Sequence, residues 1–251
     1  MYKSKNLLSV SADAKTVKGE TFGFLTGIMY LAPYKSVQGY NMCSMAEIAD
    51  CGTACLATAG RGAMSNVAQG RLNKSIWFIN EQATFMSQLV DNVKQLINKA
   101  KKQNKKPLIR LNGTSDIRWE NISFTYDGIF YENIFAMFPA VQFYDYTKIA
   151  NRKDIPANYD LTFSYSGVLA FQPYVNKAVK AGMRVAVVFR SSAIIPTTFR
   201  GMECVNGDNS DIRHLDAQGV VVALYAKGKG KTDTTGFVVD KAQRIINIMA
   251  V

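Results

Sequence analysis

The most reactive side chains in this sequence are its cysteines, and three of the four lie close together. Cys43, Cys51 and Cys55 follow the spacing C-x7-C-x3-C within residues 41–62, a stretch that also carries several glycines. Thiolates are soft ligands for zinc and for iron–sulfur clusters. Clustered cysteines in a reducing compartment are more typical of metal or redox chemistry than of a disulfide framework. We therefore interpret this stretch as a metal or cluster loop.

The spacing by itself leaves three uses of these cysteines open. An iron–sulfur cluster held by three thiolates would leave one iron open to a substrate or cofactor, and the spacing favours this use. Structural zinc would need a fourth ligand, for which Cys204 and His214 are the soft candidates, and zinc ligands usually come as closely spaced pairs. Thiols that only pack, or a single reactive thiol, are the remaining alternative.

Length and composition indicate one folded α/β domain. With 251 residues, of which 48% are hydrophobic, the chain can bury one sizeable core. We expect a single domain over residues 1–251, with residues 1–21 lying across the surface before the first strand. The apolar runs are shorter than the roughly 20 residues of a membrane helix, and the N-terminus lacks a signal-peptide pattern. The sequence therefore predicts a cytoplasmic protein with no membrane partner.

The charge balance is strongly basic, with 30 Lys and Arg against 19 Asp and Glu and a formal net charge of +11. Such an excess favours polyanionic partners through electrostatic steering and counterion release, so DNA, RNA or a phosphorylated small molecule is a predicted partner. A basic surface that only aids solubility is the alternative, and lysines at a helix end also complement the helix dipole. The candidate phosphate contacts lie in two lysine-rich segments: Lys101, Lys102, Lys105, Lys106, Lys227, Lys229 and Lys231.

Hydrophobic periodicity predicts the elements that position these residues. Residues 21–33 are rich in aromatic and β-branched side chains and predict a strand that leads into the cysteine loop. Residues 63–102 carry apolar side chains at helical spacing. Short apolar segments then predict strands at 108–111, 141–144, 161–163, 184–189 and 220–225, with a helix at 174–181. This alternation predicts a parallel β/α barrel, TIM-like and partial or complete, whereas an open doubly wound sheet is the alternative.

Polar residues follow four of these strands, at the place where parallel α/β folds bind their ligands. We expect them to converge at one end of the sheet, although polar loops and helix caps would show the same composition. The candidate pocket residues are Arg110, Asn112, Ser115, Asp116, Tyr146, Lys148, Ser164 and Arg190. Asp116, Glu120, Asp145 and Lys148 could also do acid–base work without a metal, as in a hydrolase or transferase.

Several ordered segments resemble a phage-encoded family known as gene product 88. The matching segments are LLSVSADAKTVKGE at 7–20, CGTACLATAGRG at 51–62, RLNGTSD at 110–116, FYDYTK at 143–148 and VNGDNSDIRHLD at 205–216. The cysteine loop, followed by strands bearing R-x-N-x-x-x-D and Y-x-Y-T-K, is also similar to radical S-adenosylmethionine enzymes. Those enzymes space their ligands C-x3-C-x2-C with an aromatic residue before the third, where this chain has Ala54.

The resemblance implies a TIM-like barrel with a 4Fe–4S cluster on Cys43, Cys51 and Cys55 and with S-adenosylmethionine at the open iron. It implies catalytic roles for Asp116, Tyr146 and Lys148. Contacts to the cofactor would come from Arg110, Asn112, Ser115, Ser164 and Arg190. The first hypothesis is thus an iron–sulfur phage protein, and possible radical enzyme, that acts on nucleic acid or a nucleotide. The alternative is a non-catalytic nucleic-acid-binding phage protein whose cysteines hold zinc or only pack.

Overall fold

The computed structural model describes residues 4–11 and 14–240, and these divide into two compact units. The first unit runs to Met42 and resumes over Ser65–Asp145 and Arg152–Asp160. The second contains Cys43–Met64, Tyr146–Asn151 and the chain from Leu161 onward. The cysteine loop therefore belongs to the second unit, whereas the two long helices that follow it belong to the first.

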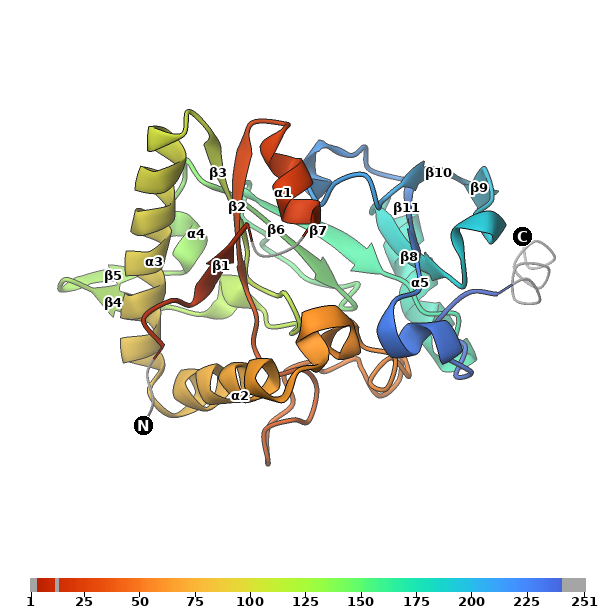
Figure 1. The fold of residues 1–251 in the computed structure, drawn as a ribbon, viewed down its shortest axis with the longest axis horizontal. Coiled ribbons are helices and arrows are strands. Elements are labelled where there is room, and N and C mark those ends of the chain that lie inside the picture. The colour runs from red at the N-terminus through yellow and green to blue at the C-terminus, as the bar shows by residue number, and fades with distance from the viewer. Residues whose placement is uncertain (1–3, 12–13, 241–251) are drawn as a thin grey trace. The chain divides into compact units, whose positions relative to one another are not determined.

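The strands form an open, mostly parallel sheet, so the predicted barrel is wrong. Nine strands follow the order β1-β2-β3-β6-β7-β8-β11-β10-β9, and β4 and β5 form a separate hairpin (Figure 1). The terminal strands β1 (Leu8–Val10) and β9 (Thr198–Phe199) are short, and each pairs antiparallel with its neighbour. A barrel needs its first and last strands to pair, and within the described residues these two do not. The described chain also has five α-helices, too few for a helix after every strand.

In the first unit, three parallel strands carry the candidate site. β2 (Phe24–Met29) pairs in parallel with β3 (Lys106–Arg110), and β3 pairs in parallel with β6 (Gln142–Thr147). The predicted helical stretch consists of two helices, α2 (Ser65–Asn80) and α3 (Gln82–Lys102), which meet at Glu81. The apolar side of α3 is buried as its spacing predicts, because it covers β2 and β3.

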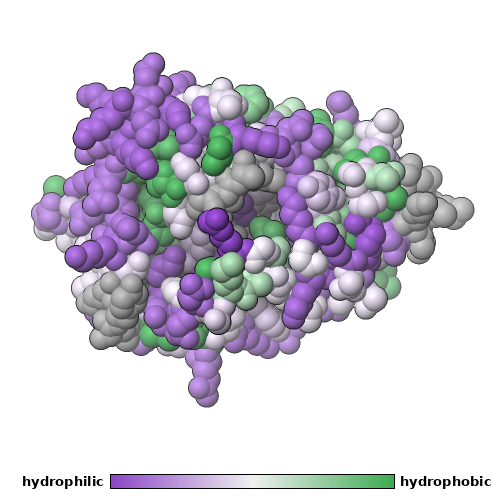
Figure 2. All heavy atoms as spheres, viewed as in Figure 1, coloured by the Kyte–Doolittle hydropathy of each residue, from purple (hydrophilic) through white to green (hydrophobic). Residues whose placement is uncertain are grey.

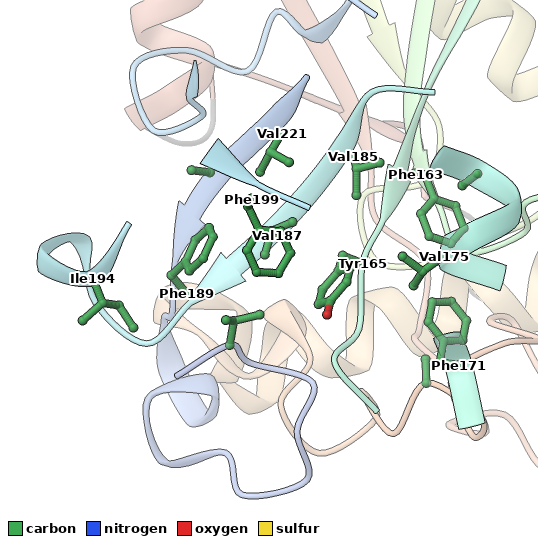
Figure 3. Close-up of a cluster of buried hydrophobic side chains, with 14 residues drawn as sticks. Phe163, Tyr165, Phe171, Val175, Val185, Val187, Phe189, Ile194, Phe199 and Val221 are labelled. Carbon is green, nitrogen blue, oxygen red and sulfur yellow. The ribbon is translucent and has the colours of Figure 1, made fainter. Parts of the chain in front are cut away.

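In the second unit, the central strands β8 and β11 are mostly buried and consist of continuous apolar runs. β8 (Val185–Phe189) pairs in parallel with β11 (Val221–Tyr225), and β10 (Met202–Asn206) pairs with the other edge of β11. β7 (Tyr159–Ser164) enters this unit at Leu161 and pairs in parallel with β8. Figure 3 shows the core, in which Phe163, Phe171, Val175, Val187 and Phe189 pack together. Both faces of such strands are buried, which explains their lack of polar alternation.

The remaining elements are short, and one of them differs from the expectation for residues 1–21. That segment was expected to lie across the surface, but β1 adds to the edge of β2 and buries Leu7 and Leu8. Helix α5 (Gln172–Lys180) confirms the helix predicted at 174–181. The other elements are α1 (Ala14–Glu20), β4 (Phe124–Tyr126), β5 (Ile129–Tyr131) and α4 (Ile134–Met137).

Gly113 follows β3 at a place where the backbone has no room for a side chain. Its N–H donates to the Met29 carbonyl oxygen at 2.9 Å, and an added Cβ would lie 2.6 Å from that same oxygen. We predict that Gly113→Ala lowers the free energy of unfolding by about 2 kcal/mol, because backbone atoms must move apart. Urea unfolding would measure this loss.

Gly70 provides a matched control for Gly113. It lies inside α2, where an added Cβ would meet nothing within 4 Å. Gly70→Ala should raise the free energy of unfolding by about 0.5–1 kcal/mol, since alanine restricts the unfolded chain and favours the helix. Equal effects of the two substitutions would contradict the packing described at Gly113.

Candidate functional site

Asn112 is the centre of a buried polar network in the first unit. Its backbone N–H donates to Asp145 Oδ1 at 2.7 Å, and its Nδ2 donates to Asp145 Oδ2 at 3.3 Å and to the Ile117 carbonyl oxygen at 2.9 Å. Its Oδ1 accepts from Ser115 Oγ at 2.9 Å, from the Ile117 N–H at 3.0 Å and from Trp119 Nε1 at 3.1 Å. One side chain thus fixes both the turn after β3 and the carboxylate on β6.

Arg152 extends this network to two more carboxylates. Its guanidinium forms a two-pronged ion pair with Glu120, with Nε 2.9 Å from Oε1, and its Nη1 lies 3.8 Å from Asp116 Oδ1. Nη2 also donates to Tyr159 Oη at 3.2 Å, and Tyr159 Oη donates to Asp145 Oδ2 at 2.8 Å. The result is a continuous path of hydrogen bonds from Glu120 to Asn112.

Burial controls the electrostatics of this network. Asp145 is fully buried, and desolvation raises the pKa of its carboxyl from 3.8 to about 7, although the charge of Arg110 and the hydrogen bond from Asn112 oppose that rise. Two arginines, Arg110 and Arg152, face three carboxylates here. When Asp145 is protonated, the two arginines balance the charges of Asp116 and Glu120, so the buried network carries little net charge.

The pocket residues that the sequence predicts in the first unit therefore lie together. Their polar groups make contacts within the protein, where a pocket would direct them toward a ligand. Asn112 contacts Asp145, Ser115 contacts Asn112, and Asp116 lies near Arg152. Arg152 and Tyr159 complete the group and had not been predicted. Both lie in a polar stretch with no motif, so no sequence signal distinguished them from surface residues.

In the second unit, Lys148, which directly follows β6, connects the end of that strand to the end of β7. Its Nζ donates to Ser164 Oγ at 3.0 Å and to the carbonyl oxygens of Ser164 and Tyr165 at 3.1 and 3.2 Å. The ammonium also lies 4.7 Å from the ring centre of Phe237 and 5.4 Å from that of Phe171. A buried ammonium needs such acceptors and aromatic faces, and these contacts favour a structural role for Lys148.

Tyr146 and Arg190, also in the second unit, make separate contacts. Tyr146 Oη donates to Asp211 Oδ1 at 3.2 Å. Arg190, directly after β8, donates from Nη1 to the carbonyl oxygens of Gly230 and Lys231, both at 3.0 Å. Arg190 therefore holds the loop that follows β11.

The three cysteines of the loop have local contacts and do not form a recognisable ligand set. Cys55 Sγ accepts from the Ala57 N–H at 3.4 Å at the start of the turn Leu56–Thr58, and Cys51 packs against the hydrophobic core. Within the described residues, no three His, Cys, Asp or Glu side chains are gathered as a metal ion requires. This placement gives no support to a cluster or a zinc site, and the iron–sulfur assignment stays a prediction.

The lysines named as phosphate contacts differ in their surroundings. Lys101, Lys102 and Lys106 are exposed, as are Lys229 and Lys231. Lys105 forms an ion pair with Glu20, and Lys227 Nζ lies 3.0 Å from Asp208 Oδ1. The exposed lysines remain available to a partner, whereas Lys105 and Lys227 already have an acidic neighbour.

Fold and site together define an open-sheet α/β protein with buried polar networks and a basic surface. The chain belongs to the gene product 88 family of phage proteins, because that family's model matches residues 3–241. This confirms the family predicted from the sequence. The searches of curated proteins and of solved structures each found no match, so the likeness to radical S-adenosylmethionine enzymes has no support from them. No helix in the described chain is long and apolar enough to cross a membrane.

The raised pKa of Asp145 predicts a pH-dependent stability. The carboxyl is protonated in the folded protein up to about pH 7 but ionises near pH 4 when unfolded, so the folded state binds the extra proton between these values. Stability from this group is therefore lost as the pH rises through that window. In Asp145→Asn, which cannot titrate, the loss between pH 5 and pH 8 should be smaller than in the native protein. Parallel pH slopes of Tm would contradict this assignment.

The iron–sulfur prediction is tested by metal analysis after anaerobic purification. It expects brown protein with bound iron and sulfide, and loss of both in Cys51→Ser. Cys204→Ser is the matched control, because Cys204 lies outside the three-cysteine loop. Colourless, iron-free native protein under these conditions would contradict the prediction.

Proposed function

We propose that this phage protein binds nucleic acid, and that the exposed lysines of α3 contact the phosphate backbone. The observation that carries this proposal is the composition of the exposed side of α3. Lys94, Asn98 and Lys101 recur at helical spacing, and Gln95, Lys99 and Lys102 form the adjacent row. All six side chains are exposed, and Figure 2 shows hydrophilic side chains gathered over the C-terminal end of this helix.

This side of the helix presents mainly positive charge. Asp91 is the one acidic residue within α3, and its carboxylate accepts a hydrogen bond from Tyr126 at 2.8 Å. Lys94 lies over the Tyr126 ring at 4.1 Å, which leaves its charge close to the surface. Lys106 continues the basic character past the helix end. A polyanion binds to such a surface mainly because binding releases the counterions that it had condensed.

The helix dipole explains only part of this pattern. Cations in the last turn stabilise a helix by about 0.3–1 kcal/mol, which accounts for Lys99, Lys101 and Lys102. The effect falls off beyond the last turn, so it gives no reason for Lys94. A second helix, α5, also ends in lysines, Lys177 and Lys180, and lacks a basic row that extends along it.

The contacts of the predicted catalytic residues favour this function over an enzyme built on them. Asp116 and Tyr146 contact charged partners within the protein, and Lys148 makes three hydrogen bonds. Partners of this kind hold these side chains in fixed positions, which favours a structural role. We therefore treat them as structural.

The double substitution Lys101→Gln/Lys102→Gln should weaken DNA binding and lower the slope of log Kd against log salt by up to about 2, since each lost phosphate contact removes close to one counterion. Fluorescence anisotropy with a labelled oligonucleotide at several salt concentrations would measure both quantities.

The matched control is Lys177→Gln/Lys180→Gln. It removes the same charge from exposed lysines at the end of another helix. A specific α3 surface predicts a larger loss for the α3 variant. Equal losses would show that only net charge matters, and native protein without salt-dependent binding would overturn the proposal.

A further inference from the structure

A polar pocket of about 310 Å³ opens in the second unit beside the cysteine loop. Thr53 and Ala54, which lie between Cys51 and Cys55, form one side. The loop after β11 forms the other side with Lys229, Thr232, Asp233, Thr234 and Thr235. The volume is at the lower end of the range for small-molecule sites, about 300–1,000 Å³.

Specific contacts hold the two sides of this pocket together. Thr235 Oγ1 donates to the Asp50 carbonyl oxygen at 3.0 Å, directly before the cysteine segment. Gly228 packs so closely on this segment that an added Cβ would lie 2.8 Å from Ala59 Cα. Arg190 also holds the loop after β11 in place through its hydrogen bonds to the carbonyl oxygens of Gly230 and Lys231. These contacts hold the two sides of the pocket in fixed positions.

The pocket also lies where this kind of sheet binds ligands. Its longer loop begins just after β11, and Arg190 comes directly after β8, so both mark the carboxyl ends of neighbouring parallel strands. In open α/β sheets, ligands bind outside these carboxyl ends. The cysteine segment closes the same end of the second unit.

The side chains of the pocket suit an anion. The side chains of Thr53, Thr234 and Lys229 have no hydrogen bond or ion pair to another described residue, so two hydroxyls and one ammonium remain for a ligand. The Asp233 carboxylate faces its own loop: Oδ1 accepts from the Thr235 N–H at 3.4 Å, and Oδ2 accepts from the Val238 N–H at 3.0 Å. The carboxylate oxygens of Asp233 therefore bind groups of their own loop. The hydroxyls of Thr53 and Thr234 and the ammonium of Lys229 determine which ligand the pocket can bind.

We propose that this pocket binds the phosphate group of a small phosphorylated ligand. Lys229 supplies the charge, and the hydroxyls of Thr53 and Thr234 donate hydrogen bonds to the phosphate oxygens, which are strong charge-assisted contacts. This site goes beyond the proposed nucleic-acid function, because it uses residues of the second unit and none of the lysines of α3. It also gives the cysteine segment a role as one side of a binding pocket.

Titration calorimetry with inorganic phosphate tests this site. The native protein should bind one phosphate per chain, and Lys229→Gln should weaken binding about tenfold or more, as expected for loss of a charge-assisted contact. Thr53→Val, which keeps the side-chain shape and removes the hydroxyl, should weaken it by about fivefold. Thermal unfolding of each variant would verify that the fold is kept.

Lys180→Gln is the matched control, because it removes the same charge from an exposed lysine of the same unit, outside the pocket. It should bind phosphate as the native protein does. Equal weakening by Lys229→Gln and Lys180→Gln, or no phosphate binding to the native protein, would overturn the proposal. DNA binding of Lys229→Gln measured alongside separates this outcome from failure of the α3 surface.

Discussion

The hydrogen bonds between Asn112 and Asp145 are the constraint on which the first unit depends. They join the turn after β3 to the middle of β6, deep in an apolar environment where every unsatisfied polar group costs about 1–3 kcal/mol. Because Asn112 also accepts from Trp119, the same residue orients a fully buried indole ring. The strand ends are thereby fixed by polar contacts that tolerate little displacement.

This arrangement explains why residues with catalytic potential favour a structural role. Carboxylates, arginines and a tyrosine lie together, but each is balanced by the others, and the raised pKa of Asp145 keeps the buried charge small. Lys148 repeats this principle in the second unit, where acceptors and aromatic rings surround its ammonium. The groups still open to partners lie elsewhere, on the exposed side of α3 and in the pocket that contains Lys229.

The cysteine segment, residues 51–62, forms one side of a pocket in the second unit. Gly228 of the loop after β11 packs closely on Ala59 of this segment, and Thr53, between two cysteines, lines a polar pocket. The spacing of the thiols had indicated a ligand set, but ligand sets require side chains that converge in space. Sequence spacing restricts such convergence without determining it, because the loop backbone sets the direction of each side chain.

The sequence by itself determined the local features of this protein. The buried strands β8 and β11, the amphipathic helix α3 and the lysine-rich segments follow from patterns within a few residues, and the quoted segments predicted the gene product 88 family. Only the tertiary structure decided that the sheet is open, because short edge strands such as β1 and β9 carry little pattern of their own and form through pairing. It likewise decided that Arg152 and Tyr159 join Asp145, since contacts between residues distant in sequence leave no periodic signal.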